Sequence, residues 1–142
     1  MYSSLKEMAP EQVLEKLDAA DVLIIDNVGM LSRLYKYATI TYVGGGFNKS
    51  GIHNTLEAAV FGKPVLFGPN YQKFREAREL LACGAAYSYT NQAELIQALE
   101  DLLGDETALL RSSAAAADYV HTNGGATQKI LDFIQEKRLL TN

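Results

Sequence analysis

The residues whose types and spacing could do chemistry lie in one glycine-rich stretch, residues 42–54. It contains the run Gly44-Gly45-Gly46, and Gly51 stands shortly before His53 and Asn54. Glycine has no Cβ, so the backbone can turn sharply there and approach a ligand closely. The stretch leads into a helical pattern, and free N–H groups at a helix start favour an anion such as phosphate. Spacing alone leaves two interpretations open, a phosphate-binding loop and a tight turn between strand and helix.

Two common phosphate-binding fingerprints do not fit this stretch. Gly46 and Gly51 have the spacing of the two glycines of a P-loop, but Ile52-His53 stands where Lys-Ser/Thr must follow. Gly44-x-Gly46 begins like a dinucleotide fingerprint, yet Lys49 takes the place of its third glycine. The spacing therefore disfavours a P-loop ATPase and an NAD-dependent enzyme.

The elements that must position the glycine stretch alternate between strand and helix. Four short apolar runs, rich in β-branched or aromatic residues, recur at intervals of about twenty, and their lack of alternation suits strands buried on both faces. Segments with helical spacing separate them, and parallel strands need crossover helices. The order predicts an α/β fold with a doubly wound parallel sheet. The predicted strands are residues 22–25, 40–43, 64–67 and 85–89, and the helical segments between them include 31–38, 56–60 and 74–81.

Residues that are typical of helix starts support this order of elements. Pro10 suits the first turn of a helix, and Asn54 and Asn91 each precede a Glu by three residues, which is the spacing of a capping box. After residue 91 the chain is expected to be helical over about 92–103, 105–120 and 126–138. Nucleotide-binding sheets of this type usually have six strands, whereas four are predicted here. We therefore expect residues 1–142 to form a single domain that lacks its N-terminal strands.

Composition excludes several classes of function. The chain has 142 residues, a net charge of −4 and 48% hydrophobic residues, which predicts a soluble globular domain without the basic surface of a nucleic-acid binder. No apolar run approaches the 18 or more residues of a membrane span. Cys83 is the single cysteine and the two histidines lie far apart, so we expect no metal site.

A longer pattern surrounds the glycine stretch. His53-Asn54 is followed by Leu56-Glu57-Ala58-Ala59, and Gly68-Pro69 begins eleven residues after Glu57. Upstream, an apolar run leads into Asp26, Gly29 and Leu31, and downstream Gly124-Gly125 opens the last helical segment. Over about residues 20–135 this pattern resembles the carboxyl-terminal half of bacterial 3-deoxy-D-manno-octulosonic acid (Kdo) transferases. That family is similar to glycosyltransferases of the GT-B type, which have two Rossmann-like domains.

The resemblance implies that the chain is part of a transferase. It implies transfer of Kdo, with inversion and without a metal or other cofactor, from CMP-Kdo to the lipid A precursor in lipopolysaccharide biosynthesis. The implied location is the cytoplasmic face of the bacterial inner membrane. The half that this chain resembles holds the CMP-sugar, whereas the other half holds the acceptor, the membrane contact and the catalytic base. The chain alone is therefore expected to be inactive, with no catalytic residue of its own.

The resemblance also implies roles for individual residues. Glu57 would accept hydrogen bonds from the ribose hydroxyls, or else act only as a capping acid. His53 would lie near the phosphate, or else be a turn residue, and Asn54 would cap a helix whose first amides face the phosphate. The remaining expected donor contacts come mainly from backbone, at Gly29, Met30, Gly44, Gly45, Gly51, Gly68 and Pro69.

Two other functions fit the residues. One is a GT-B transferase that uses a UDP-sugar, and the other is a non-catalytic α/β interaction module in which the glycine stretch is only a turn. A truncated sheet also leaves the predicted strand at 22–25 without a neighbour on one side, and unpaired strand edges promote association. We therefore expect a homo-oligomer formed through that edge or through the N-terminal segment.

Overall fold

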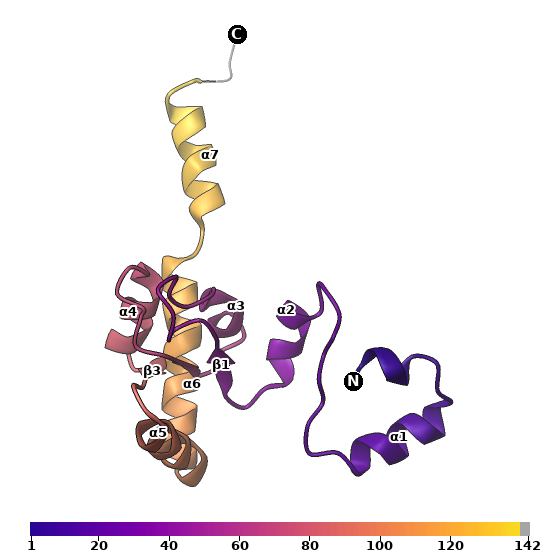
Figure 1. Ribbon diagram of the computed structural model, residues 1–142. Coiled ribbons are helices and arrows are strands. Elements are labelled where there is room, and N and C mark those ends of the chain that lie inside the picture. Colours follow the sequence, from indigo (N-terminus) through magenta and orange to yellow (C-terminus); the bar gives the residue numbers. More distant parts are fainter. Residues whose placement is uncertain (140–142) are drawn as a thin grey trace. The chain divides into compact units, whose positions relative to one another are not determined.

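The computed structural model, which describes residues 1–139, contains a parallel three-stranded sheet together with helices (Figure 1). The chain divides into two compact units, Met1–Leu34 and Tyr35–Asn142, and each is described by itself. The sheet lies entirely in the second unit, so the α/β fold class expected from the sequence is confirmed there.

The first unit consists of short helices and extended segments. It contains the 3₁₀ helix η1 (Ser3–Leu5) and the α-helices α1 (Pro10–Asp18) and α2 (Leu31–Leu34). Pro10 stands at the start of α1 as the sequence predicts, because its missing N–H would have no helical partner there.

The predicted strand at residues 22–25 is wrong. These residues form no strand, and the side chains of Val22 and Ile24 are 77% and 55% exposed. The carbonyl of Ile24 accepts a hydrogen bond from the Tyr2 N–H at 2.8 Å, and Asp26 accepts bonds from Ser3. An apolar run shows that a segment could be buried, but a strand also needs a partner strand. The expectation of self-association through this edge therefore loses its basis.

The second unit holds the sheet and the remaining helices. Its strands are β1 (Thr41–Val43), β2 (Val65–Phe67) and β3 (Ala86–Ser88), within three of the predicted runs. The order is β1-β2-β3, with Thr41 opposite Val65 and Val65 opposite Ala86. Among the described residues β1 pairs only with β2, so β1 is an open edge of the sheet.

Helices follow each strand in the second unit. The helix predicted over residues 31–38 is instead split, since α2 ends at Leu34 and the 3₁₀ helix η2 (Tyr35–Tyr37) follows. The later helices occupy the predicted positions within a few residues. They are α3 (Leu56–Ala59), α4 (Arg75–Ala82), α5 (Gln92–Gly104), α6 (Glu106–Asn123) and α7 (Ala126–Glu136).

The core packs sheet residues against α3, α4 and α6. Val65 and Phe67 of β2, Ala58 of α3, Leu80 of α4 and Ala116 of α6 are all completely buried. β2 is the central strand, and all three of its residues are buried, as expected for a parallel strand covered on both faces. This core fixes the carboxyl ends of β1 and β2, where the loops with the candidate residues begin.

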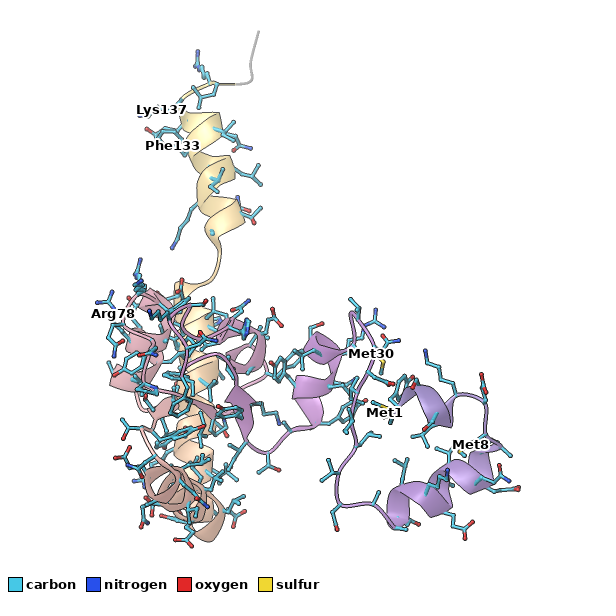
Figure 2. The ribbon with its side chains drawn as sticks, in the orientation of Figure 1. Met1, Met8, Met30, Arg78, Phe133 and Lys137 are labelled. Carbon is cyan, nitrogen blue, oxygen red and sulfur yellow. The ribbon has the colours of Figure 1, made fainter. Side chains whose placement is uncertain are left out.

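Some large apolar side chains are exposed, but none of the described helices could span a membrane. On α7, Phe133 is 54% exposed, and the Lys137 Nζ lies 5.9 Å from the centre of its ring (Figure 2). No helix within residues 1–139 combines the length and apolar character needed to cross a bilayer.

Candidate functional site

The glycine stretch forms a loop between β1 and α3 that folds back on itself. The His53 N–H donates to the Gly44 carbonyl at 3.1 Å. Gly45 has φ +90°, and a Cβ built on it would lie 2.5 Å from the Gly51 carbonyl oxygen and 3.2 Å from the His53 ring. Only glycine fits at Gly45, because both the backbone conformation and the available space exclude a side chain.

A second contact joins this loop to the loop after β2. A Cβ on Gly46 would lie 2.7 Å from the Gly68 backbone, and the Asn70 N–H donates to the Gly46 carbonyl at 2.9 Å. The Asn70 side-chain amide also donates to the Asn48 carbonyl at 2.9 Å. The glycines are therefore required for the packing of the two loops, which supports the tight-turn interpretation whether or not a ligand approaches them.

The start of α3 differs from the predicted capping box. The Asn54 Oδ1 accepts from the Leu56 N–H at 3.0 Å, and the Glu57 Oε1 accepts from the Asn54 side-chain amide at 3.2 Å. Glu57 thus binds the capping side chain, whereas a capping box would bind a backbone N–H. Because α3 has only four residues, its dipole is small, and helix-terminal attraction for a phosphate is weaker than the sequence suggests.

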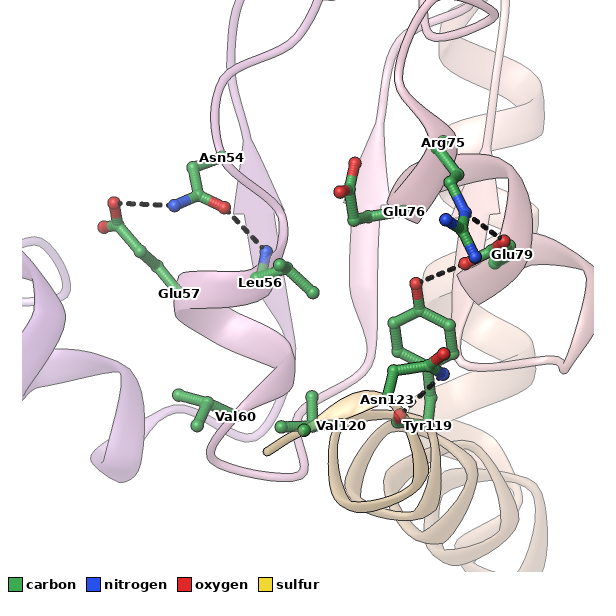
Figure 3. Close-up of a pocket in the computed structure, with 11 residues that line it drawn as sticks. Asn54, Leu56, Glu57, Val60, Arg75, Glu76, Glu79, Tyr119, Val120 and Asn123 are labelled. Carbon is green, nitrogen blue, oxygen red and sulfur yellow. Dashed lines mark hydrogen bonds and ion pairs between the residues drawn. The ribbon is translucent and has the colours of Figure 1, made fainter. Parts of the chain in front are cut away.

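A pocket of about 520 Å³ lies between α3, α4 and the end of α6. Asn54 and Glu57 stand on one side of it, and Arg75, Glu79 and Tyr119 stand on the other (Figure 3). A smaller hollow of about 320 Å³ adjoins it and is lined by His53 together with Asn54. The full lining of the larger pocket is Asn54, Leu56, Glu57, Val60, Arg75, Glu76, Glu79, Tyr119, Val120, Asn123 and Gly124.

The wall opposite Glu57 is a chain of three polar side chains. The Tyr119 hydroxyl donates to the Glu79 Oε2 at 2.6 Å, and the Arg75 Nε donates to the Glu79 Oε1 at 2.7 Å (Figure 3). The bond from Tyr119, followed by that from Arg75, lowers the pKa of Glu79. Burial, together with the bond to Glu79, raises the pKa of Tyr119 to about 12.

The charge of the larger pocket restricts what it can hold. Glu57, Glu76 and Glu79 contribute three carboxylates against the single guanidinium of Arg75. Such a lining repels phosphate groups and favours a ligand rich in hydroxyl or amine donors. Within residues 1–139, no group of three or more His, Cys, Asp or Glu side chains is arranged to hold a metal ion.

The structure brings only some of the predicted site residues together. His53, Asn54 and Glu57 line the two adjoining cavities, and Gly44, Gly45, Gly51 and Gly68 shape the loops beside them. Pro69 is half-buried after β2 and lines neither cavity. Gly29 and Met30 belong to the first unit, so they are not part of this site as described.

Sequence reasoning missed the Arg75, Glu79 and Tyr119 wall. Arg75 and Glu79 are four residues apart on α4, a spacing at which ion pairs form on a helix surface, so this pair could have been found. Tyr119 is 40 positions from Glu79, and nothing in the local pattern joins them.

The Tyr119 hydroxyl gives a prediction for alkaline pH. Its pKa is about 12 in the folded chain against 10.0 for an unperturbed tyrosine, so the folded chain binds this proton more tightly. The resulting stabilisation is complete below pH 10 and is lost as the pH rises toward 12. Burial and a bond with Tyr42 raise the pKa of Tyr89 to about 12 as well.

Burial, followed by the charge of Glu57, also raises the pKa of Tyr35. We therefore expect three of the eight tyrosines to ionise late in a spectrophotometric titration at 295 nm. Tyr119→Phe should leave two late tyrosines and make the loss of stability between pH 10 and 12 shallower. Tyr37→Phe is the control, because Tyr37 is 75% exposed, and it should keep all three late tyrosines. Three late tyrosines in the Tyr119→Phe variant would contradict the assignment.

The chain is similar in sequence to several known enzymes that share one name. The chain is 39% identical over 84 residues to the 3-deoxy-D-manno-octulosonic acid transferase of Aquifex aeolicus, a match over 58% of this chain and 24% of the relative. It is 36% identical to the enzyme of that name from Rickettsia typhi, over 79% of this chain and 24% of the relative. The corresponding enzyme of Bordetella pertussis is 32% identical, over 82% of this chain and 27% of the relative.

Solved structures show the same fold. The C-terminal CMP-Kdo binding domain of WaaA from Acinetobacter baumannii matches with a TM-score of 0.65 and 21% identity, over 78% of this chain and 65% of that one. No protein-family model matches the chain. These three relatives share one enzyme name, and the chain spans only about a quarter of their length. The chain is therefore related, over most of its own length, to the 3-deoxy-D-manno-octulosonic acid transferases.

Proposed function

We propose that this chain binds the nucleoside of CMP-Kdo, as the donor-binding part of a Kdo transferase. The observation that carries the proposal is the half-buried Glu57 carboxylate at the rim of the 520 Å³ pocket, on the helix that follows the glycine loop. The relatives are Kdo transferases by name, and the structural neighbour is a CMP-Kdo binding domain.

The chemistry of Glu57 suits a ribose. Its Oε1 accepts from Asn54, and among the described residues no hydrogen bond is made to its Oε2. A carboxylate only accepts hydrogen bonds, and a ribose offers two neighbouring hydroxyl donors. The volume of the pocket falls within the usual range for small-molecule sites. Its negative lining also fits a nucleoside better than the charged phosphate, which would lie toward His53 and the glycine loop.

Transfer of Kdo to an acceptor is proposed only for a longer protein that contains a region like this chain. The chain corresponds to about a quarter of each relative, so the proposal gives it donor binding and leaves acceptor binding and the catalytic base to the rest of that length. General-base catalysis needs a group within hydrogen-bond reach of the attacking hydroxyl. We expect this chain alone to form no product from CMP-Kdo and lipid A precursor. A place beside the inner membrane belongs to the same proposal.

Titration with CMP followed by amide chemical shifts tests the donor role. We expect weak, saturable shifts around Asn54 and Glu57, near millimolar affinity, which corresponds to about −4 kcal/mol. Glu57→Gln should weaken binding roughly tenfold or more, because a hydrogen bond to a charged group contributes about 1.5–3 kcal/mol. The control is Glu100→Gln, which makes the same charge change on α5, outside the pocket.

The alternatives give different results in the same titration. Equal shifts with UMP or UDP would favour a transferase that uses a UDP-sugar. No shifts with any nucleotide would favour a non-catalytic interaction module. Binding of CMP that is unchanged by Glu57→Gln would leave Glu57 as a partner of the capping side chain only.

A further inference from the structure

A second hollow, of about 410 Å³, lies between the glycine loop and the loop that follows β2. Lys49 and Ser50 line it from the first loop, and Asn70, Gln72 and Lys73 line it from the second. No acidic residue is among its lining residues, in contrast to the three carboxylates of the larger pocket. The two cavities therefore have opposite charge.

The two lysines of this hollow are available to a ligand. Both residues are exposed, and within residues 1–139 neither side chain forms an ion pair or a hydrogen bond. An ammonium group without a partner offers three hydrogen-bond donors and a full positive charge. The hollow has the chemistry to receive an anion with several acceptor oxygens.

The backbone that carries the lysines is held in place by the rest of the two loops. The Asn48 Oδ1 accepts from the N–H groups of Ser50 and Gly51, at 3.0 and 3.2 Å. The Asn70 side-chain amide ties the second loop to the Asn48 carbonyl. Gly51 also packs against Phe74, since a Cβ on Gly51 would lie 2.5 Å from that ring. These contacts hold the backbone of the two loops that carry Lys49 and Lys73 beside the same hollow.

The position of the hollow in the sheet supports a ligand role. Lys49 follows the carboxyl end of β1, and Lys73 follows the carboxyl end of β2. Open α/β sheets bind their ligands at this edge. Lys63, by contrast, precedes β2 and lies at the opposite edge.

We propose that Lys49 and Lys73 form a site for an anionic carboxylate or phosphate group. The inference deepens the proposed function, on which it rests. The nucleoside occupies the acidic pocket beside Glu57, and the lysine hollow takes an anionic group of a substrate. Two sources have that chemistry, the carboxylate of the sugar acid and a phosphate group of the nucleotide or of the acceptor.

The test is an amide chemical-shift titration of this chain, at constant ionic strength, with free Kdo and with inorganic phosphate as separate probes. We expect saturable shifts at residues 49–51 and 70–73 with at least one probe. The variant Lys49→Gln/Lys73→Gln should weaken that binding by about tenfold or more, which corresponds to about 1.4 kcal/mol. Lys63→Gln, a charge-matched control, should bind as the unchanged chain does.

Each result separates the possibilities. Stronger binding of free Kdo assigns the hollow to the sugar acid, and stronger binding of phosphate assigns it to a phosphate group of the nucleotide or of the acceptor. Absence of shifts at these residues overturns the proposal, as does equal weakening by Lys63→Gln, which would indicate general charge screening. A cytidine titration of the double variant is independent of this result, because cytidine has no phosphate and shifts at Glu57 report on the nucleoside pocket.

Discussion

Gly51→Ala is expected to lower the free energy of unfolding by about 2–5 kcal/mol. Gly51 has φ +86°, a conformation that costs an L-residue about 1–2 kcal/mol. A Cβ there would also lie 2.5 Å from the Phe74 ring and 2.8 Å from the Asn70 carbonyl oxygen. The ring can move, but the carbonyl belongs to the backbone of the neighbouring loop, and such overpacking adds about 1–3 kcal/mol. Urea unfolding followed by circular dichroism measures the change.

Gly84→Ala separates the two causes of this loss. Gly84 has φ +78°, close to that of Gly51, but a Cβ on it would meet nothing within 4 Å. This control should lose only the conformational part, about 1–2 kcal/mol. Equal losses in the two variants would contradict the steric part of this prediction, because they would show that the loop after β2 accommodates the added methyl group without cost.

The sequence was a reliable guide where local patterns decide the structure. Residues 40–43, 64–67 and 85–89 each contain a strand, because a short apolar run between helices has few other ways to be buried. The helix start predicted at Asn91 is also confirmed, since its Oδ1 accepts from the Glu94 N–H at 3.1 Å. The second bond of a capping box is replaced, because the Glu94 carboxylate accepts from the Thr90 N–H and from the Asn91 side-chain amide. Both features depend on residues that are close together in the chain.

Predictions failed where distant residues decide the structure. The run at 22–25 is at least as apolar as the confirmed strands, yet it lacks a partner strand among the described residues. Asn54 has the same spacing to Glu57 as Asn91 has to Glu94, but it precedes a helix of four residues where Asn91 precedes one of thirteen. A spacing rule does not include the length or the surroundings of the helix that it predicts.

The sequence predicted only the part of the candidate site whose residues are close together in the chain. His53, Asn54 and Glu57 are close in sequence and line adjoining cavities, so a local motif was enough to find them. The opposite wall comes from α4 and α6, and Lys73 comes from the loop after β2. Which of these residues face the glycine loop depends on how helices pack on the sheet, and local spacing does not encode that packing.

Phe67→Ala is expected to have an effect as large as that of Gly51→Ala. Phe67 is completely buried in the central strand β2, and its ring centre lies 5.4 Å from that of Tyr71. Removing a buried phenylalanine ring costs about 3–5 kcal/mol, a large part of the 5–15 kcal/mol that stabilises a typical domain. Phe133→Ala is the control, because Phe133 is half-exposed on α7 and its loss should cost less than about 1 kcal/mol.

The position of Phe67 also makes this variant a test of how the core supports the site. Phe67 directly precedes Gly68, whose backbone contacts Gly46 in the glycine loop. If Phe67→Ala does not fold, Phe67→Leu keeps most of the apolar volume and should lose about 1–2 kcal/mol, which remains measurable. A loss from Phe67→Ala no greater than that from Phe133→Ala would mean that the sheet is not the stabilising core. In that case the core could not be what holds the glycine loop and the loop after β2 together.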